Sequence, residues 1–239
     1  MSDMIDAANS GDGSERAPGF FGKVMTHGDF VSRRLAPAPL AIWDAWLQAC
    51  MQGSREQLGG DWLDIYLTSP IWRFALAPGV LDDHSWAGVL MPSVDRVGRH
   101  FPLTIAAAAP GGAAVMDCLA SGQPWFDQLE ALALSSLADG FVLDQFDAAL
   151  LALAPLPEQD DAGRFGAAGY RTTLASLDAL PAALPALTAA ALRGQSVWWS
   201  DGSAAVEPTL LMCRGLPAPA SFAGMLAGTW AQSGWAALA

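Results

Sequence analysis

Side chains that can do chemistry are concentrated between residues 19 and 103 of this chain. Ser93, Asp95 and His100 fall within eight residues of one another, and they could supply a nucleophile, an orienting carboxylate and a base. His27 lies in an earlier turn and offers a second base. However, no G-x-S-x-G elbow is present, and Pro-Ser-Val-Asp is equally typical of a turn closed by a serine or aspartate side chain. A small hydrolase is therefore the alternative hypothesis for this chain, not the favoured one.

The residue types of the stretch also suit metal or phosphate binding, but their spacing does not. Imidazole and carboxylate groups that can ligate a metal are found at His27, Asp29, Asp44, Asp95 and His100. None of them has the spacing of a motif such as H-E-x-x-H, so we predict no metal site and no cofactor. Residues 22–29 read GKVMTHGD, which contains a Gly-Lys pair but not the full phosphate-binding loop motif.

Three arginines stand out in a chain that is otherwise poor in charge. Arg96 and Arg99 lie three apart around Gly98, and Arg73 follows Trp72. Guanidinium groups recognise phosphate well, so Arg96 and Arg99 would serve the alternative hypothesis of a phosphate-handling enzyme. We favour an internal network in which buried Arg–Asp pairs fix the loops. The predicted network consists of Asp29, Asp44, Arg73, Arg96 and Arg99, with at least two of the arginines paired to Asp29, Asp44 or Asp95.

The composition excludes several classes of function. With 239 residues, of which 52% are hydrophobic and 15% charged, the chain can bury a sizeable globular core. A net charge of −12 argues against binding to nucleic acid or to an anionic membrane, because both need clustered Lys and Arg. The three cysteines have no metal-site spacing, and the N-terminus lacks the apolar core of a signal peptide. We therefore expect no membrane insertion.

Acidic charge is concentrated in residues 101–163, which contain no Lys or Arg. Nine acids lie there: Asp117, Asp127, Glu130, Asp139, Asp144, Asp147, Glu158, Asp160 and Asp161. One interpretation of this pattern is a solvated surface that keeps the protein in solution. The other is an acidic face that attracts a basic partner.

Hydrophobic periodicity predicts the elements that must position these side chains. Short apolar or alternating runs predict strands at 20–24, 71–77, 86–91, 103–109, 197–199 and 209–213, with a weak one at 165–170. Helical spacing predicts helices at 40–51, 61–67, 125–138, 141–153 and 181–192. Trp43 and Trp46 share one helix face, whereas Trp198 and Trp199 should point to opposite faces of a strand.

The charge-free segment 215–239 predicts a final helix rather than a membrane span. It contains two prolines and four glycines, and Ser221 is a suitable N-cap. Phe222, Leu226 and Trp230 recur every four residues, which indicates a helix packed on the core. The order of elements, strands first, then helices, then strands and a helix, favours an α+β fold. Residues 1–17 are predicted to be a disordered tail and residues 18–239 a single domain.

The stretch between residues 19 and 105 resembles a family of type VI secretion accessory proteins, usually called TagF or ImpM. The matching segments are GK at 22–23, GDF at 28–30, Arg34, WDAW at 43–46, YL at 66–67, PIWRF at 70–74, GVLMPSVDRVGR at 88–99 and FPL at 101–103. Residues 194–202, GQSVWWSDG, look like the Trp-rich C-terminal strand of the family. Met25 departs from the proline that many relatives have there, which affects only the geometry of the first turn.

The resemblance implies both a fold and a function. The implied fold is an α/β/α sandwich around a mainly antiparallel sheet, similar to longin or profilin-like domains. The implied function is that of a cytoplasmic, non-enzymatic regulator that restrains the secretion machine after translation. Such proteins act in the same pathway as a threonine kinase, a PP2C-type phosphatase and a forkhead-associated (FHA) scaffold protein. We expect binding to that scaffold to be the mode of action.

We expect the partner to bind at loop 92–102, which reads PSVDRVGRHFP between two predicted strands. Its two bounding prolines limit the freedom of the loop, so its presentation to a partner costs little further ordering. The candidate partner-binding residues are Asp95, Arg96, Val97, Arg99 and His100. The competing surface is the acidic region 117–161, where binding should weaken steeply as the salt concentration rises.

Overall fold

The computed structural model describes residues 17–109, 115–155, 176, 178, 181–182 and 184–237. The predicted disordered tail lies outside the described residues except for Ala17, and so does the weak strand predicted at 165–170. The described part is built on one seven-stranded sheet ordered β2-β1-β5-β4-β3-β6-β7. Every pairing in this sheet is antiparallel, and the predicted α+β fold is confirmed.

Strands and helices follow one another as the sequence order predicts. The strands are β1 (Gly19–Gly22), β2 (Val31–Arg33), β3 (Trp72–Leu76), β4 (Ser85–Met91), β5 (Leu103–Ala109), β6 (Gln195–Ser200) and β7 (Thr209–Arg214). The helices are α2 (Pro37–Leu58), α3 (Trp62–Thr68), α4 (Val115–Ala120), α5 (Gln123–Ser135), α6 (Leu143–Leu151), α7 (Leu184–Leu192) and α8 (Phe222–Ala227). Single 3-10 turns, Gly59–Asp61 and Pro219–Ser221, precede α3 and α8.

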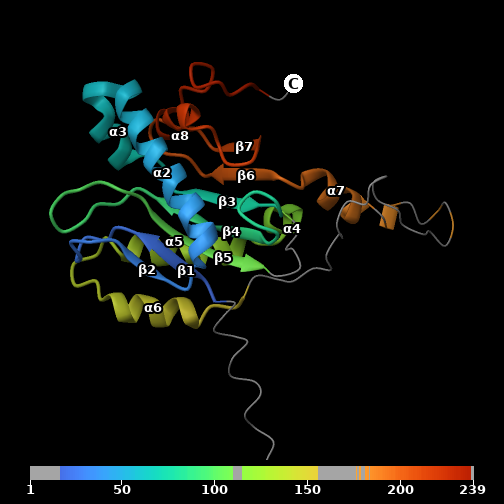
Figure 1. The fold of residues 1–239 in the computed structure, drawn as a ribbon, viewed down its shortest axis with the longest axis horizontal. Helices are drawn as coiled ribbons and strands as arrows, with labels where there is room; N and C mark the ends of the chain where they lie inside the picture. Colours follow the sequence, from blue (N-terminus) through green and yellow to red (C-terminus); the bar gives the residue numbers. More distant parts are fainter. Residues whose placement is uncertain are drawn as a thin grey trace, which may run out of the picture.

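Helices cover both faces of the sheet, so the described residues form three layers (Figure 1). On one face α2, α3 and α8 bury a core rich in aromatic side chains, including Trp43, Trp62 and Phe222. On the other face α5 and α6 bury a second core that includes Phe126 and Phe146. This arrangement is the α/β/α sandwich that the family resemblance implies.

β6 shows how one strand supplies both cores. The predicted opposite orientation of Trp198 and Trp199 is confirmed, because side chains alternate between the faces of a strand. Trp198 is fully buried and its ring lies 6.0 Å from that of Trp43 on α2. Trp199 faces the other way, and its ring lies 4.8 Å from that of Phe126 on α5. Trp199 is half-buried, so the structure does not leave it fully exposed.

Three elements differ from the predicted ones. The sequence did not predict β2 and α4, because elements of three and six residues are too short to show a period. α2 is longer than predicted and begins at Pro37, whose fixed φ suits the first turn of a helix. In the part of the chain that the structure describes, the remaining predicted helices and strands are present with shifted ends.

The C-terminal segment is less helical than predicted. α8 ends at Ala227, because Gly228 adopts a left-handed φ of 70° that ends the helix. Trp230 therefore lies beyond the helix, although its ring still packs edge-on against Trp72. Ser221 occupies the predicted N-cap position of α8, but its hydroxyl makes no capping hydrogen bond there. None of the helices among the described residues has the length and apolar character needed to cross a membrane.

Candidate functional site

The turn between β1 and β2 and the loop between β4 and β5 meet at one end of the sheet (Figure 1). The backbone N–H of Arg96 donates to the carbonyl of His27 at 3.0 Å and joins the two segments. Gly22 has a φ of 140°, and a Cβ there would lie 2.1 Å from the carbonyl oxygen of Pro102. Only glycine allows this close approach. We call the exposed face of residues 23–30 and 92–102 the paired-loop surface.

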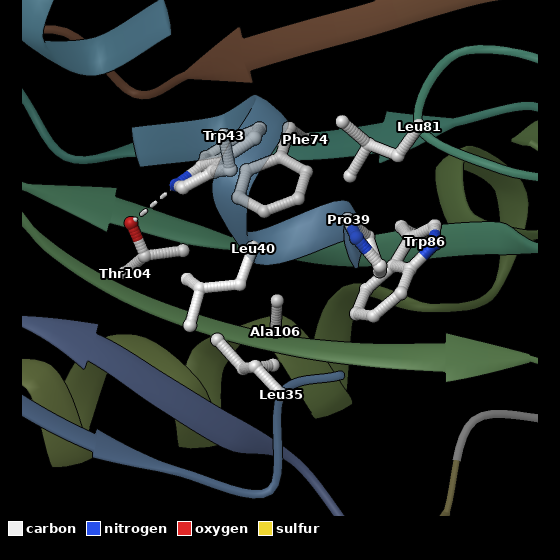
Figure 2. Close-up of a pocket in the computed structure, with 9 residues that line it drawn as sticks. All are labelled: Leu35, Pro39, Leu40, Trp43, Phe74, Leu81, Trp86, Thr104 and Ala106. Carbon is white, nitrogen blue, oxygen red and sulfur yellow. Dashed lines mark hydrogen bonds between the residues drawn. The ribbon is translucent and has the colours of Figure 1, made fainter. Parts of the chain in front are cut away.

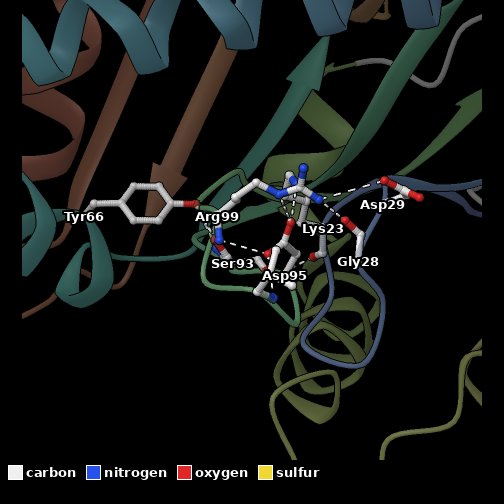
Figure 3. Close-up of polar contacts among 8 residues, drawn as sticks. Lys23, Gly28, Asp29, Tyr66, Ser93, Asp95 and Arg99 are labelled. Carbon is white, nitrogen blue, oxygen red and sulfur yellow. Dashed lines mark hydrogen bonds and ion pairs between the residues drawn. The ribbon is translucent and has the colours of Figure 1, made fainter.

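The carboxylate of Asp95 joins the two halves of the paired-loop surface (Figure 3). Its Oδ1 accepts hydrogen bonds from the backbone N–H groups of Val97 and Arg99, both at 2.9 Å. Its Oδ2 accepts from Lys23 Nζ at 2.5 Å and from Arg99 Nε at 2.7 Å. The Asp95 side chain is fully buried and that of Lys23 is 7% exposed. A buried ion pair therefore ties loop 92–102 to the first turn.

The environment of Asp95 fixes its charge. Burial alone would raise the pKa of the Asp95 carboxyl, because removal from water disfavours the ion. Hydrogen bonds from Lys23, Arg99 and Val97 outweigh burial and hold the pKa well below its ordinary value. Asp95 is thus a permanent acceptor at neutral pH, which suits a structural anchor better than a group that exchanges protons.

Loop 92–102 also has a tight structure of its own. The Asp95 N–H donates to the Arg99 carbonyl, and the Gly98 N–H donates to the Asp95 carbonyl, both at 3.0 Å. Gly98 has a φ of 84°, which L side chains rarely adopt. The spacing of Asp95, Gly98 and Arg99 is therefore explained by the geometry of the turn. The turn places Val97 at its exposed tip.

Tyr66 on α3 anchors the start of the loop. Its hydroxyl donates to the carbonyl of Ser93 and accepts from the N–H of Ser93, both at 2.9 Å. The Ser93 hydroxyl in turn donates to the carbonyl of Lys23 at 2.7 Å. Burial raises the pKa of Tyr66, so its hydroxyl keeps the proton that it donates. The loop is therefore fixed from α3 as well as from the first turn.

The residues of the hydrolase alternative are not arranged as a nucleophile and a base. The Ser93 hydroxyl is buried and bonds to a backbone carbonyl. His27 Nδ1 and the hydroxyl of its neighbour Thr26 form a hydrogen bond of 3.0 Å. The ring of His100 packs edge-on against Trp62 and Tyr66, and burial is the main reason that its pKa lies below the ordinary value. Across the described residues, no cluster of three or more metal-ligating side chains is found.

Apolar side chains project from the paired-loop surface beside charged ones. Val97 is 65% exposed, Phe30 is 48% exposed and Met25 is 43% exposed. The Lys23 ammonium lies 4.8 Å from the centre of the Phe30 ring, so the ring rests on the same ion pair that fixes the loop. The Arg99 side chain remains 57% exposed even though its Nε bonds to Asp95. The surface thus combines a rigid base with an exposed apolar tip.

The predicted Arg–Asp network is present only in part. Arg99 pairs with Asp95, and its Nη2 also lies 3.8 Å from Asp29 and donates to the carbonyl of Gly28. Arg96 is exposed and forms no ion pair with any described residue. Its predicted place in the network is therefore wrong, because the tight turn directs its side chain to solvent. Arg96 contributes its backbone, through the bond to the first turn.

Arg73 belongs to a different ion-pair cluster, so its predicted pairing with Asp29, Asp44 or Asp95 is wrong. It lies on β3 between two residues of the aromatic core, and the alternation of a strand points it to the opposite face, toward α5. There Arg73 donates to Glu130 at 2.7 Å and to Asp127 at 2.8 Å. The hydrogen bond to Glu130 is the main reason that the pKa of Arg73 is raised.

Asp44 is also outside the predicted network. It lies on α2, where its Oδ2 accepts a hydrogen bond from Gln48 at 2.8 Å. Its Oδ1 is buried and has no hydrogen-bond partner among the described residues. The predicted pairing of Asp44 with an arginine was wrong, because the number of Arg and Asp residues in a stretch does not show which face of a helix a side chain occupies.

Sequence reasoning missed the two residues that hold the loop from outside, Lys23 and Tyr66. A signal for Lys23 was available, because the only lysine of the chain directly follows a buried strand. Such a lysine needs a buried acid as partner. No comparable signal marked Tyr66, since its bonds go to backbone atoms of a residue 27 positions away.

A small cavity in the aromatic core does not add to the site (Figure 2). It has a volume of about 20 Å³ and is lined by Leu35, Pro39, Leu40, Trp43, Phe74, Leu81, Trp86, Thr104 and Ala106. Trp43 Nε1 donates to Thr104 Oγ1 at 2.9 Å, so these polar atoms already have partners. The space is apolar and holds little more than one water, so it is a gap in packing rather than a ligand site.

Comparisons with known proteins place these features in a family context. A family model described as TagF N-terminal domain, Type VI secretion system-associated, matches residues 19–153, which include the whole paired-loop surface. The crystal structure of PA0076 from Pseudomonas aeruginosa PAO1 is similar to this structure, with a TM-score of 0.77 and 40% sequence identity. The match covers 89% of this chain and 94% of that chain. A comparison with curated proteins found no match.

Proposed function

The chain belongs to the TagF family of type VI secretion system-associated proteins, and on that premise we propose that it is a non-enzymatic regulator that restrains the secretion machine. In this proposal it acts in the cytoplasm by binding an FHA scaffold protein, in the same pathway as a threonine kinase and a PP2C-type phosphatase. Family membership supports the accessory role. The arrangement of Ser93 and His27, which are not placed as nucleophile and base, favours binding over catalysis.

The observation that carries the proposed binding surface is the set of four hydrogen bonds to the Asp95 carboxylate. They hold the loop in one conformation before a partner arrives, so little further freedom is lost on binding. Val97 at the tip of the loop and Phe30 in the first turn are both exposed and offer apolar surface on this rigid base. An apolar centre with charged side chains at its edge is the usual composition of a protein interface.

The competing acidic surface is largely occupied with internal contacts. The described part of region 117–161 contains six acids, and four of them form ion pairs within the chain: Asp127, Glu130, Asp144 and Asp147. A basic partner would have to compete with Arg73, Arg33 and Arg34 for these carboxylates. This competition favours the paired-loop surface as the place where the scaffold binds.

Secretion measured in cells that lack this gene tests the proposed function. The gene is restored as wild type, as Val97→Glu or as the matched control Leu187→Glu. Leu187 is also an exposed apolar residue, but it lies on α7, at the other end of the molecule from the two loops (Figure 1). We expect wild type and Leu187→Glu to suppress release of a type VI effector, and Val97→Glu at the same cellular level to fail. Full suppression by Val97→Glu would contradict the proposed surface.

A further inference from the structure

β7 ends the sheet on the side opposite β2, and no strand among the described residues lies beside its outer edge. The Gly215 N–H donates to the Gly194 carbonyl at 2.7 Å, immediately beyond the paired ends of β7 and β6. Because bonding alternates along an antiparallel pair, Leu211 and Cys213 turn their backbone groups toward β6. Leu210 and Met212 turn theirs outward, and no described segment bonds to them. An edge with such unpaired groups is a template for another strand.

A groove runs along this edge. It has a volume of about 410 Å³, and two segments line it: Thr209–Met212 of β7 on one side, and Trp230, Trp235, Ala236 and Ala237 of the C-terminal segment on the other. Figure 1 shows the C-terminal segment passing beyond β7, on the side away from β6. Leu210 is 55% exposed and Met212 is 52% exposed. The groove therefore offers backbone hydrogen bonds on one side and apolar side chains around them.

The two ends of β7 carry opposite charges that are not used within the described structure. Glu207 precedes the strand, and Arg214 ends it. Both residues are exposed, and neither forms an ion pair with a described residue. The edge is thus charged with opposite sign at its two ends, and a bound strand of complementary polarity would satisfy both charges.

We propose that the β7 edge is a docking site for an extended segment of another protein, which adds an antiparallel strand in the groove between β7 and the C-terminal segment. Antiparallel addition continues the pattern of the whole sheet. In that direction the bound segment carries an acidic residue near its N-terminal end, opposite Arg214, and a basic residue near its C-terminal end, opposite Glu207. The residues of the bound segment that lie opposite Leu210 and Met212 are apolar, and they contact these two side chains on the same face of the sheet.

A second copy of this chain is a poorer occupant than a single extended segment. The side of the groove that faces β7 is formed by Trp230, Trp235, Ala236 and Ala237 of the C-terminal segment. Two β7 edges could pair only if both C-terminal segments moved aside. The site is separate from the paired-loop surface, since the two lie on segments far apart in the sheet order.

A strand tethered to the full chain tests this proposal, because a tether gives a weak ligand a millimolar effective concentration. The C-terminus is extended by a Gly/Ser linker of about 20 residues, which is flexible and long enough to reach the groove. The linker is followed by the test strand Glu-Thr-Val-Thr-Val-Thr-Thr-Lys, whose glutamate and lysine lie opposite Arg214 and Glu207 and whose valines lie opposite Met212 and Leu210. Amide hydrogen exchange is measured at each residue of β7. We expect exchange at Leu210 and Met212 to slow at least about tenfold, while Leu211, already paired to β6, changes little.

Two controls decide what causes the protection. The same strand with proline in place of both valines lacks the two N–H groups that point to β7 and should give no protection. A strand with its end charges exchanged should protect roughly two- to five-fold less, and the protein variant Glu207→Arg/Arg214→Glu should reverse that preference. Absence of protection by the test strand, or equal protection by the proline strand, would overturn the proposal. So would a dimer of the unextended chain in which Leu210 and Met212 are already protected.

Discussion

At the scale of single residues, the charge of Asp95 governs the paired-loop surface. Two backbone N–H groups and the side chains of Lys23 and Arg99 donate to its two oxygens. All four hydrogen bonds are strongest to the ionised carboxylate. Protonation of Asp95 would weaken the loop, its turn and the link to the first turn together.

This dependence predicts an acid-sensitive part of the stability. The folded-state pKa of Asp95 lies below its unfolded value of about 3.9, so its contribution is present above that pH and is lost as the pH falls below about 4. As the pH is lowered from about 5 to about 3, we expect the urea midpoint of wild type to fall more steeply than the midpoint of Asp95→Asn. Asp139→Asn is the control, because Asp139 is exposed and has no partner among the described residues. Parallel curves for wild type and Asp95→Asn would contradict the role given to Asp95.

The arginines differ sharply in their expected contributions to stability. The Arg73 side chain is 7% exposed and binds Glu130 and Asp127, so Arg73→Ala leaves two carboxylates without their cation. We expect it to lower the free energy of unfolding by about 3 kcal/mol, the lower end for a broken buried pair because both carboxylates keep some contact with water. Arg96→Ala should change it by less than about 0.5 kcal/mol. Denaturant melts measure both, and equal losses would contradict the buried ion-pair role given to Arg73 and the exposed position given to Arg96.

At the scale of elements, the middle of the sheet tolerates no extra volume. Gly88 lies on the central strand β4, where a Cβ would come within 2.1 Å of the Ile105 carbonyl oxygen and 2.9 Å of the Phe74 ring. Two flanking strands hold its backbone, so it cannot move away. We expect Gly88→Ala to cost roughly 3 kcal/mol. Gly60→Ala is the matched control, because no atom lies within 4 Å of its added Cβ. Thermal melts that show the same loss for both would contradict this packing.

Much of the element order could be predicted because long elements carry a readable period. α2 and α5 bury one stripe each, and β4 and β5 are mostly apolar runs between turn residues. The three-residue strand β2 could not be predicted, since pairing with β1 rather than its own pattern defines it. The same limit applies to the end of the chain, where Gly228 ends α8 before the four-residue repeat does.

The site could be predicted only as far as local turn chemistry reaches. The Pro-Ser-Val-Asp sequence is typical of a turn closed by a serine or aspartate side chain, and in the structure the Asp95 carboxylate accepts from the N–H groups of Val97 and Arg99. The partners that come from elsewhere, Lys23 and Tyr66, are 72 and 27 residues away from the groups they bind. The position of Arg73 depends on the face of β3 that it occupies. Pairings of this kind follow from the arrangement of the sheet and helices, which residue types alone do not give.

At the scale of the whole molecule, two surfaces differ in how salt should affect them. The paired-loop surface has an apolar tip, whereas the acidic region 117–161 acts through exposed charge. Exposed charges are screened over about 10 Å at 0.1 M salt, so binding through the acidic region would weaken steeply with salt. Binding through the paired-loop surface should change little. Because the net charge of the chain is −12, a contact through acidic side chains should respond clearly to the salt concentration.

Titration of the purified FHA scaffold protein into this protein at about 0.05 and 0.5 M salt tests the central claim most directly. The titrations use wild type, Val97→Glu and Asp139→Lys/Asp144→Lys, each with an unchanged unfolding midpoint. We predict that wild type binds with similar affinity at both salt concentrations. Val97→Glu should weaken binding at least about tenfold, and the charge-reversed variant less than about threefold. Loss of binding in the charge-reversed variant, with Val97→Glu like wild type, would contradict the paired-loop surface as the place of contact.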